Sequence, residues 1–190
     1  TARIFTVMAT AVALMIGAAA GDLRAAGDRM TGVVRGGGKP QKNVVVWLEG
    51  VPATPPSAET TVVLGQRNLE FRPHVLAVRT GTRVEMPNSD RVFHNVFSFH
   101  DGKKFDLGLY PVGTTKVVTF DRPGLSRIFC NIHPNMAAYV LAVESAFFAV
   151  SDHEGRFAIG GVPPGTHTWH AWRPGSDTRK GTITVEPDRP

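Results

Sequence analysis

The chain has very little cysteine. Among its 190 residues only Cys130 carries a thiol, which excludes an internal disulfide framework. A chain of this length can bury a hydrophobic core without covalent staples and has room for one or two domains. In an oxidising compartment an unpaired thiol is a liability unless it is buried or coordinated to a metal. The residues around Cys130 are therefore the first place to look for function.

Long runs of like charge are also missing. The formal net charge is +5, and it falls to +4 without residues 1–20, whose one charged residue is Arg3. No run of lysine or arginine is longer than two residues. A nucleic-acid interface needs a clustered basic patch, so nucleic-acid binding is not expected.

Residues 1–20 differ in composition from the rest of the chain. Arg3 precedes an uncharged stretch from Ile4 to Ala20 that ends in three alanines. This pattern is typical of a cleavable export signal. A membrane span needs about 20 apolar residues, and this stretch is short and rich in small residues. Membrane attachment would require an uncleaved signal anchor and is not expected. The sequence predicts a signal peptide over residues 1–20 and a periplasmic or otherwise exported protein.

A sustained apolar period of 3.6 residues is absent after Ala26, whereas short β-branched and aromatic runs recur between glycines and prolines. The sequence therefore predicts an all-β protein. Strands are expected at residues 30–35, 43–49, 61–64, 69–71, 75–79, 83–86, 92–98, 115–120, 126–130, 137–143, 147–150, 156–159, 167–172 and 182–185. One small β-sandwich does not hold so many strands, so two sandwiches are expected.

One short stretch gathers three soft or nitrogenous metal ligands. It contains a thiol, an imidazole and a thioether at Cys130, His133 and Met136, and His94 opens an apolar segment well upstream. A type 1 (blue) copper site needs two imidazole nitrogens and a thiolate in a near-trigonal plane, with a weak axial thioether. The sequence therefore predicts one copper ion in the plane of His94, Cys130 and His133. Met136 is expected on the axis.

Each of these residues also has an ordinary interpretation. Cys130 could be a small buried hydrophobe, and Met136 could fill the core. His94 and His133 could be surface histidines, so it is the joint spacing that favours copper. Zinc is disfavoured because a thioether is a poor zinc ligand, and a two-copper centre would need a second cysteine. His100, close in sequence to the ligand strand, is a candidate substitute ligand or secondary metal contact.

Two segments resemble the cupredoxin family. Of the amicyanin-like and plastocyanin-like members of that family, the amicyanin-like ones are most similar in their Cys-x-x-His-x-x-Met spacing. The matching residues are Val78, Gly81, Thr82, Val84, Asn88, Asp90 and His94–Val96 in the first segment and Phe120, Pro123, Gly124, Cys130, His133 and Met136 in the second. The resemblance implies a Greek-key β-sandwich, one type 1 copper ion and the four ligands named above. It also implies a second shell of Asn95, Asn131 and Pro134, in which Asn95 ties the two ligand loops together by hydrogen bonds. Asn131 departs from the threonine or serine of many relatives.

A second resemblance concerns the residues on both sides of that region. Residues 151–159 and 162–167, with an acidic glycine turn and a Pro-Pro-Gly turn, resemble the carboxypeptidase regulatory-like (transthyretin-like) β-sandwich. Residues 32–34 and 40–50 resemble its opening strands. We therefore expect residues 29–50 and 146–188 to form one sandwich, with residues 57–145 inserted into it as a copper domain. The proline-rich stretch 52–56 is the expected outgoing linker.

The expected function is one-electron transfer by Cu(II)/Cu(I) cycling between redox partners, with a dehydrogenase or a c-type cytochrome as the protein partner. By resemblance, His133 is the surface portal for the electron. The alternative is a copper storage or delivery protein, which would favour exchangeable Met and His clusters, whereas only Met86 and Met136 follow Met30. An enzyme with Cys130 as nucleophile is not expected, because no oxyanion or orienting motif accompanies the cysteine.

Overall fold

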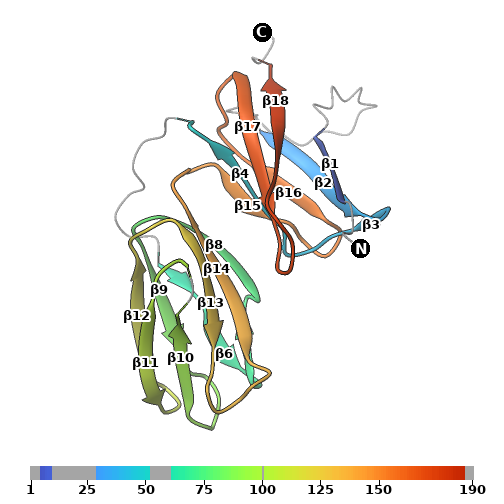
Figure 1. Cartoon of the computed structure of the whole chain (residues 1–190). Coiled ribbons are helices and arrows are strands. Elements are labelled where there is room, and N and C mark those ends of the chain that lie inside the picture. Colours follow the sequence, from blue (N-terminus) through green and yellow to red (C-terminus); the bar gives the residue numbers. More distant parts are fainter. Residues whose placement is uncertain (1–4, 10–28, 52–60, 100, 187–190) are drawn as a thin grey trace, which may run out of the picture. The chain divides into compact units, whose positions relative to one another are not determined.

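The computed structural model describes residues 5–9, 29–51, 61–99 and 101–186, and throughout these ranges the regular elements are strands (Figure 1). The predicted all-β class is confirmed. The described residues hold no helix with the length and apolar character that a membrane span requires. By its internal contacts the chain divides into two compact units. One, the split unit, holds the residues up to Val51 and from Phe147 onward, and the other, the inserted unit, holds the residues between them.

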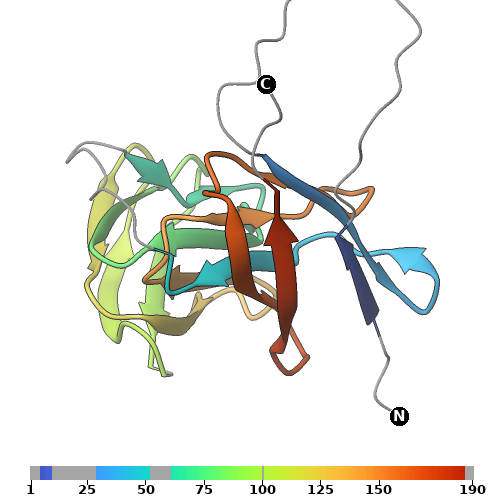
Figure 2. The same cartoon turned by 90° about the horizontal axis from the view of Figure 1, so that it is seen from above.

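The split unit contains two sheets. The first has β1 (Phe5–Ala9), β2 (Met30–Gly36) and β16 (Arg156–Ile159) in that order, with β3 (Lys39–Pro40) beside β2. The second has the order β15 (Phe148–Val150), β4 (Val45–Glu49), β17 (Gly165–Trp172), β18 (Arg179–Val185). Figure 2 shows β17 and β18, in orange and red, side by side. The pairing of β2 with β16 and of β4 with β15 and β17 joins segments more than a hundred residues apart in the chain.

Alternation along β4 explains why this segment forms a core strand. Val44, Val46 and Leu48 belong to the buried cluster of the split unit, together with residues of β2 and β16 such as Val34 and Phe157. Successive strand residues point to opposite faces, so a period of two delivers one set of side chains to the core. Such a pattern is stable only as part of a sheet whose inner face is covered.

The N-terminal segment contributes a strand that the sequence did not predict. β1 pairs antiparallel with β2, from Phe5 opposite Gly36 to Ala9 opposite Gly32. Residues 1–4 and 10–20 of the expected export signal lie outside the described residues. The same holds for the expected linker at residues 52–56 and for residue 100.

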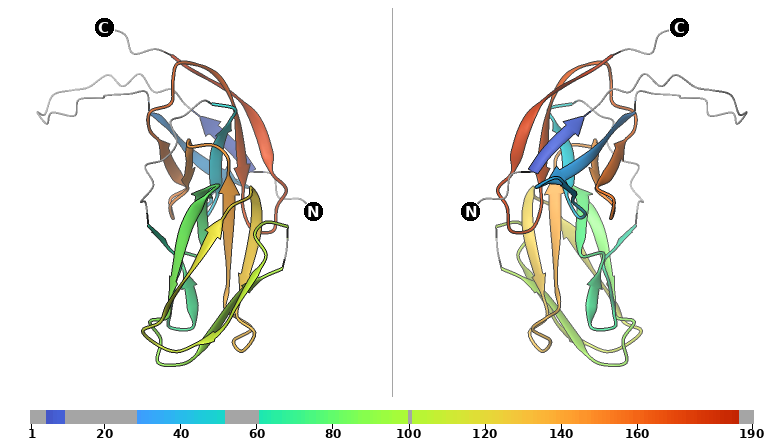
Figure 3. Two further views of the ribbon diagram at one scale, coloured as in Figure 1. Left: turned by 90° about the vertical axis from the view of Figure 1, so that its left-hand side faces the viewer. Right: turned by 90° about the vertical axis from the view of Figure 1, so that its right-hand side faces the viewer.

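The inserted unit is a sandwich of two main sheets, seen from its two sides in Figure 3. The larger sheet has the order β11 (Phe105–Tyr110), β10 (His94–Ser98), β13 (Gly124–Phe129), β14 (Ala137–Val143), β8 (Val75–Arg79). The smaller has the order β12 (Thr115–Phe120), β9 (Thr82–Pro87), β5 (Val62–Val63), and a hairpin is formed by β6 (Gly65–Arg67) and β7 (Glu70–Arg72). The core between the sheets includes Val84, Phe120, Ile128 and Val140.

The register of the larger sheet brings distant segments together at one end. Phe97 of β10 lies opposite Phe129 of β13 in an antiparallel pair. The start of β10 therefore lies beside the end of β13. β10 begins at His94, β13 ends one residue before Cys130, and β14 begins directly after Met136. The start of β10 and the loop between β13 and β14 thus carry His94, Cys130, His133 and Met136, whereas the further candidate His100 lies outside the described residues.

Candidate metal centre

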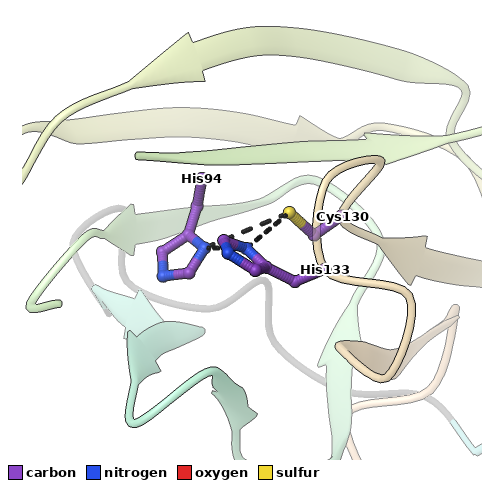
Figure 4. Close-up of side chains that lie close together, drawn as sticks. All are labelled: His94, Cys130 and His133. Atoms are coloured by element: carbon purple, nitrogen blue, oxygen red, sulfur yellow. Dashed lines mark hydrogen bonds between the residues drawn. The ribbon is translucent and has the colours of Figure 1, made fainter. Parts of the chain in front are cut away.

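Three potential metal ligands converge at this end of the sheet: His94, Cys130 and His133 (Figure 4). The Nδ1 atoms of the two histidines are 3.1 Å apart. The sulfur of Cys130 is 3.6 Å from Nδ1 of His133 and 4.0 Å from Nδ1 of His94. Both rings present the same nitrogen to the sulfur, with ring planes inclined by 68°.

The size of this triangle fits a metal ion. A circle through atoms 3.1, 3.6 and 4.0 Å apart has a radius of about 2.1 Å, close to the bonds of about 2.0–2.3 Å that zinc makes to imidazole nitrogen and thiolate sulfur. One metal ion at the centre of this triangle can therefore bind all three donor atoms at once. A thiolate with two imidazoles is a soft donor set suited to copper as well as zinc.

Met136 lies in the same buried region. It is 1% exposed and belongs to one core cluster with Cys130. The Met136 amide donates to the carbonyl of His133 over 2.9 Å, and the Cys130 amide donates to the carbonyl of Met136 over 3.4 Å. These two bonds close the loop on itself, so the backbone of the loop is held at both its ends.

His94 is held from its other side by a carboxylate. Its Nε2 lies 2.8 Å from Oδ2 of Asp90, which also accepts the amide of Leu69 at 2.9 Å, while Oδ1 accepts the amide of Asn68 at 2.5 Å. Burial raises the pKa of Asp90, but hydrogen bonds from Leu69, His94 and Asn68 outweigh it and hold that pKa below its usual value. A carboxylate bonded to the second nitrogen of a ligating histidine is typical of metal sites. In the sequence alone, Asp90 is recognisable only as part of the cupredoxin-like pattern.

The expected second-shell residues are placed as follows. Asn95 is buried, and its Nδ2 donates to Oδ1 of Asp106 on β11 over 2.7 Å. Its own Oδ1 is buried and has no partner within the described part of the chain. The side chain of Asn95 therefore contacts the neighbouring strand β11. The resemblance had instead implied a hydrogen bond from Asn95 to the loop that carries Cys130. Asn131 and Pro134 are exposed.

A buried polar group that the sequence did not predict lies beneath the site. Tyr110 is opposite His94 in the β10–β11 pair. Its hydroxyl donates to the Met86 carbonyl at 3.0 Å and accepts from Nε2 of Gln66 at 2.5 Å. Burial, and in lesser part the nearby Cys130, raise the pKa of Tyr110 to about 12 despite the bond from Gln66. Strand β11 was not expected, so its pairing with the ligand strand could not be foreseen.

Several exposed apolar side chains are close to the histidine ligands in the chain or connected to them through Asp90. Four exposed side chains form what we call the apolar rim: Leu69 (49% exposed), Val92 (44%), Phe93 (55%) and Ile132 (47%). Phe93 precedes His94, Ile132 precedes His133, and Leu69 is tied to His94 through Asp90. His94 is fully buried, whereas His133 is partly exposed. The site therefore reaches the surface at His133, which directly follows Ile132 of this rim.

Comparisons with known proteins are limited to folds. No family model and no curated protein matches the chain. Among solved structures it is similar to a copper-containing nitrite reductase from Thermus scotoductus SA-01 (25% identity, 50% of this chain, 24% of that chain, TM-score 0.43). It is also similar to a purple cupredoxin from Nitrosopumilus maritimus (23% identity, 45% of this chain, 100% of that chain, TM-score 0.39). Amicyanin from Paracoccus versutus is similar too (20% identity, 54% of this chain, 100% of that chain, TM-score 0.40). The chain thus spans about a quarter of the nitrite reductase.

Proposed function

We propose that the inserted unit is a cupredoxin-type electron-transfer domain with one type 1 copper ion. The observation that carries this proposal is the triangle of Cys130 Sγ and the Nδ1 atoms of His94 and His133, whose sides match one metal ion. The thioether of Met136 shares the buried cluster and is the proposed axial ligand. When bound, copper supplies a one-electron Cu(II)/Cu(I) couple. A thioether favours copper over zinc.

The protein's part is to hold the donors in one arrangement and to keep water away. His94, Cys130 and Met136 are 0%, 4% and 1% exposed. Strand ends and the closed loop carry them, and Asp90 holds His94 from behind. Donors that do not move between oxidation states keep the reorganisation energy low. This burial also disfavours the alternative of copper storage or delivery, which calls for exposed, exchangeable ligands.

We propose that electrons enter and leave through His133, with the apolar rim as the contact surface for a dehydrogenase or a c-type cytochrome. The rim is flanked by the exposed arginines Arg67 and Arg91, one beside the Asn68–Leu69 turn and one beside Val92. A partner with apolar side chains ringed by carboxylates would match this surface. Enzymatic activity is not part of the proposal.

The remaining parts of the chain are assigned by resemblance. We propose that residues 29–50 and 146–188 form a carboxypeptidase regulatory-like sandwich around the copper domain at 57–145. Strand pairing between β2 and β16, and between β4 and both β15 and β17, supports this division. We also propose that residues 1–20 direct export to the periplasm and are removed there, which would take β1 away from the edge of β2.

Redox cycling of the copper-loaded chain tests the function. We expect an intense thiolate-to-copper absorption band that bleaches on addition of one electron equivalent and returns on reoxidation. Cys130→Ser should abolish the band. His167→Ala is the matched control, because that ring bonds to the Pro163 carbonyl in the split unit and should leave the band unchanged. A loaded protein whose band does not cycle would exclude an electron carrier and favour storage.

A further inference from the structure

Strand β12 carries a lysine on the face that it turns towards the core of the inserted unit. Val118 and Phe120 belong to that core. Lys116 lies two residues before Val118, so its side chain leaves the strand on the same face. In the register of β12 with β9 it is opposite Met86, which is fully buried. Lys116 itself is partly buried, so its charged end lies against the interior of the sandwich.

The ammonium group of Lys116 ends against Tyr110. Its Nζ lies 5.2 Å from the centroid of the Tyr110 ring and donates to the backbone carbonyl of Leu107 on strand β11. No ion pair within the described ranges involves Lys116. A carbonyl and the face of an aromatic ring attract an ammonium without carrying an opposite net charge. Lys116 is therefore a positive charge that no carboxylate compensates in this part of the chain.

The Tyr110 ring connects this charge to the candidate metal centre. Tyr110 is buried and lies opposite His94 in the β10–β11 pair. Its hydroxyl bonds to the carbonyl of Met86, and both residues belong to one core cluster with Cys130. Salt and water screen partly buried charges much less than exposed ones. The ammonium of Lys116 therefore acts on the ligand end of the sandwich more strongly than a surface charge would.

We propose that Lys116 raises the reduction potential of the metal centre through its charge. The proposal rests on the copper site proposed above. The oxidised and reduced sites differ by one positive charge at the metal, and a nearby ammonium opposes the more positive state. Lys116 therefore favours the reduced site. A lysine can also cover apolar surface with its methylene stem alone, so the test must separate charge from packing.

Three variants make that separation. Lys116→Met removes the charge but keeps an unbranched side chain that can still cover Tyr110. Lys116→Arg retains the charge and serves as the rescue variant, because a guanidinium also stacks on aromatic rings. Lys104→Met is the matched charge control. Lys104 is exposed and directly precedes β11, whose other end carries Tyr110, so this variant removes the same formal charge at the end of the strand remote from His94.

Copper titrations and voltammetry of the full chain measure the effect. Lys116→Met should strengthen Cu(II) binding relative to Cu(I) binding on the order of tenfold, because the lost charge lies in a medium of low dielectric constant. A tenfold change in that ratio lowers the potential by about 59 mV. The shift should persist at high salt, since the charge is partly buried. The thiolate absorption band should keep its wavelength, because the ligands are unchanged.

Proton NMR of the metal-free chain tests the contact independently of copper. The methylene protons next to Nζ of Lys116 lie near the face of the Tyr110 ring. They should therefore show an upfield ring-current shift in the wild type, and the corresponding protons of Lys104 should not.

The outcomes are distinct. An unchanged potential in Lys116→Met would overturn the proposal, even if the variant were less stable. An equal fall in Lys104→Met would also overturn it, since it would reflect net charge, and an equal fall in Lys116→Arg would reflect packing and have the same consequence. A wild-type chain that develops no thiolate band with Cu(II) would refute the proposed function instead. The NMR measurement would still test the contact, and a Lys116 side chain without the ring-current shift would overturn the proposal by itself.

Discussion

Removal of the Tyr110 hydroxyl should destabilise the inserted unit without removing the metal ligands. Tyr110 is 1% exposed, and its hydroxyl bonds to Gln66 and to the Met86 carbonyl. A buried hydrogen bond contributes about 1 kcal/mol net. Gln66 Nε2 also reaches the carbonyls of Met86 and Pro87, which limits the loss. We therefore expect Tyr110→Phe to lower the free energy of unfolding by about 1–2 kcal/mol.

Urea unfolding of the metal-free chain measures this effect, with Ser98→Ala as the matched control. The hydroxyl of Ser98 is also buried but has no hydrogen-bond partner among the described residues. Its removal should therefore be neutral or stabilising, because an unpaired buried polar group costs free energy. If both variants lost the same stability, hydroxyl burial alone and not hydrogen bonding would explain the result, and the reasoning would be refuted.

The pKa of Tyr110 adds a test by pH. Because folding raises that pKa from 10.0 to about 12, the folded state holds the phenol proton more tightly than the unfolded state. The resulting stabilisation is complete below pH 10 and is lost as the pH rises towards 12. Wild type should therefore lose more stability over this window than Tyr110→Phe. Parallel pH profiles for the two proteins would contradict the raised pKa.

Three further substitutions test packing, the axial ligand and the surface. Gly102→Ala should cost about 1–3 kcal/mol, because a Cβ there would lie 2.6 Å from Oγ of Ser126, whereas Gly160→Ala meets no atom within 4 Å and should be tolerated in the same unfolding assay. Met136→Leu should retain the coloured copper site but raise the potential, because loss of a weak axial donor disfavours Cu(II) more than Cu(I); an unchanged potential in voltammetry would remove Met136 from the site. Phe93→Asp, at a 55% exposed position, should slow electron exchange with a redox partner while leaving the absorption spectrum unchanged, and unaltered exchange rates would exclude the apolar rim as the contact surface.

Strands that appear in the sequence as short apolar runs or as alternating apolar and polar residues could be predicted. The expected bounds of β8, β12 and β14 coincide with those observed. In β12, Val118 and Phe120 face the core while their neighbours face solvent, which is the pattern that alternation predicts. β11 could not be predicted, because Asp106 and Gly108 interrupt its apolar residues.

Some residues of the candidate site could likewise be predicted from the sequence, and others could not. His94, Cys130 and His133 could be proposed as ligands because metal-binding residue types coincide on a short loop and at a strand start. The roles of Asp90 and Tyr110 depend on the path of the loop before β10 and on the pairing of β10 with β11. Such contacts are set by tertiary structure, and a carboxylate four residues before a histidine carries no signal outside a helix.

X-ray absorption at the copper edge of the loaded chain tests the central claim most directly. The triangle of Cys130, His94 and His133 predicts one short sulfur scatterer and two imidazole nitrogens around a single copper ion, with the sulfur absent from Cys130→Ser. A copper ion surrounded only by nitrogen and oxygen in the wild-type chain, or a sulfur signal that survives Cys130→Ser unchanged, would contradict the account.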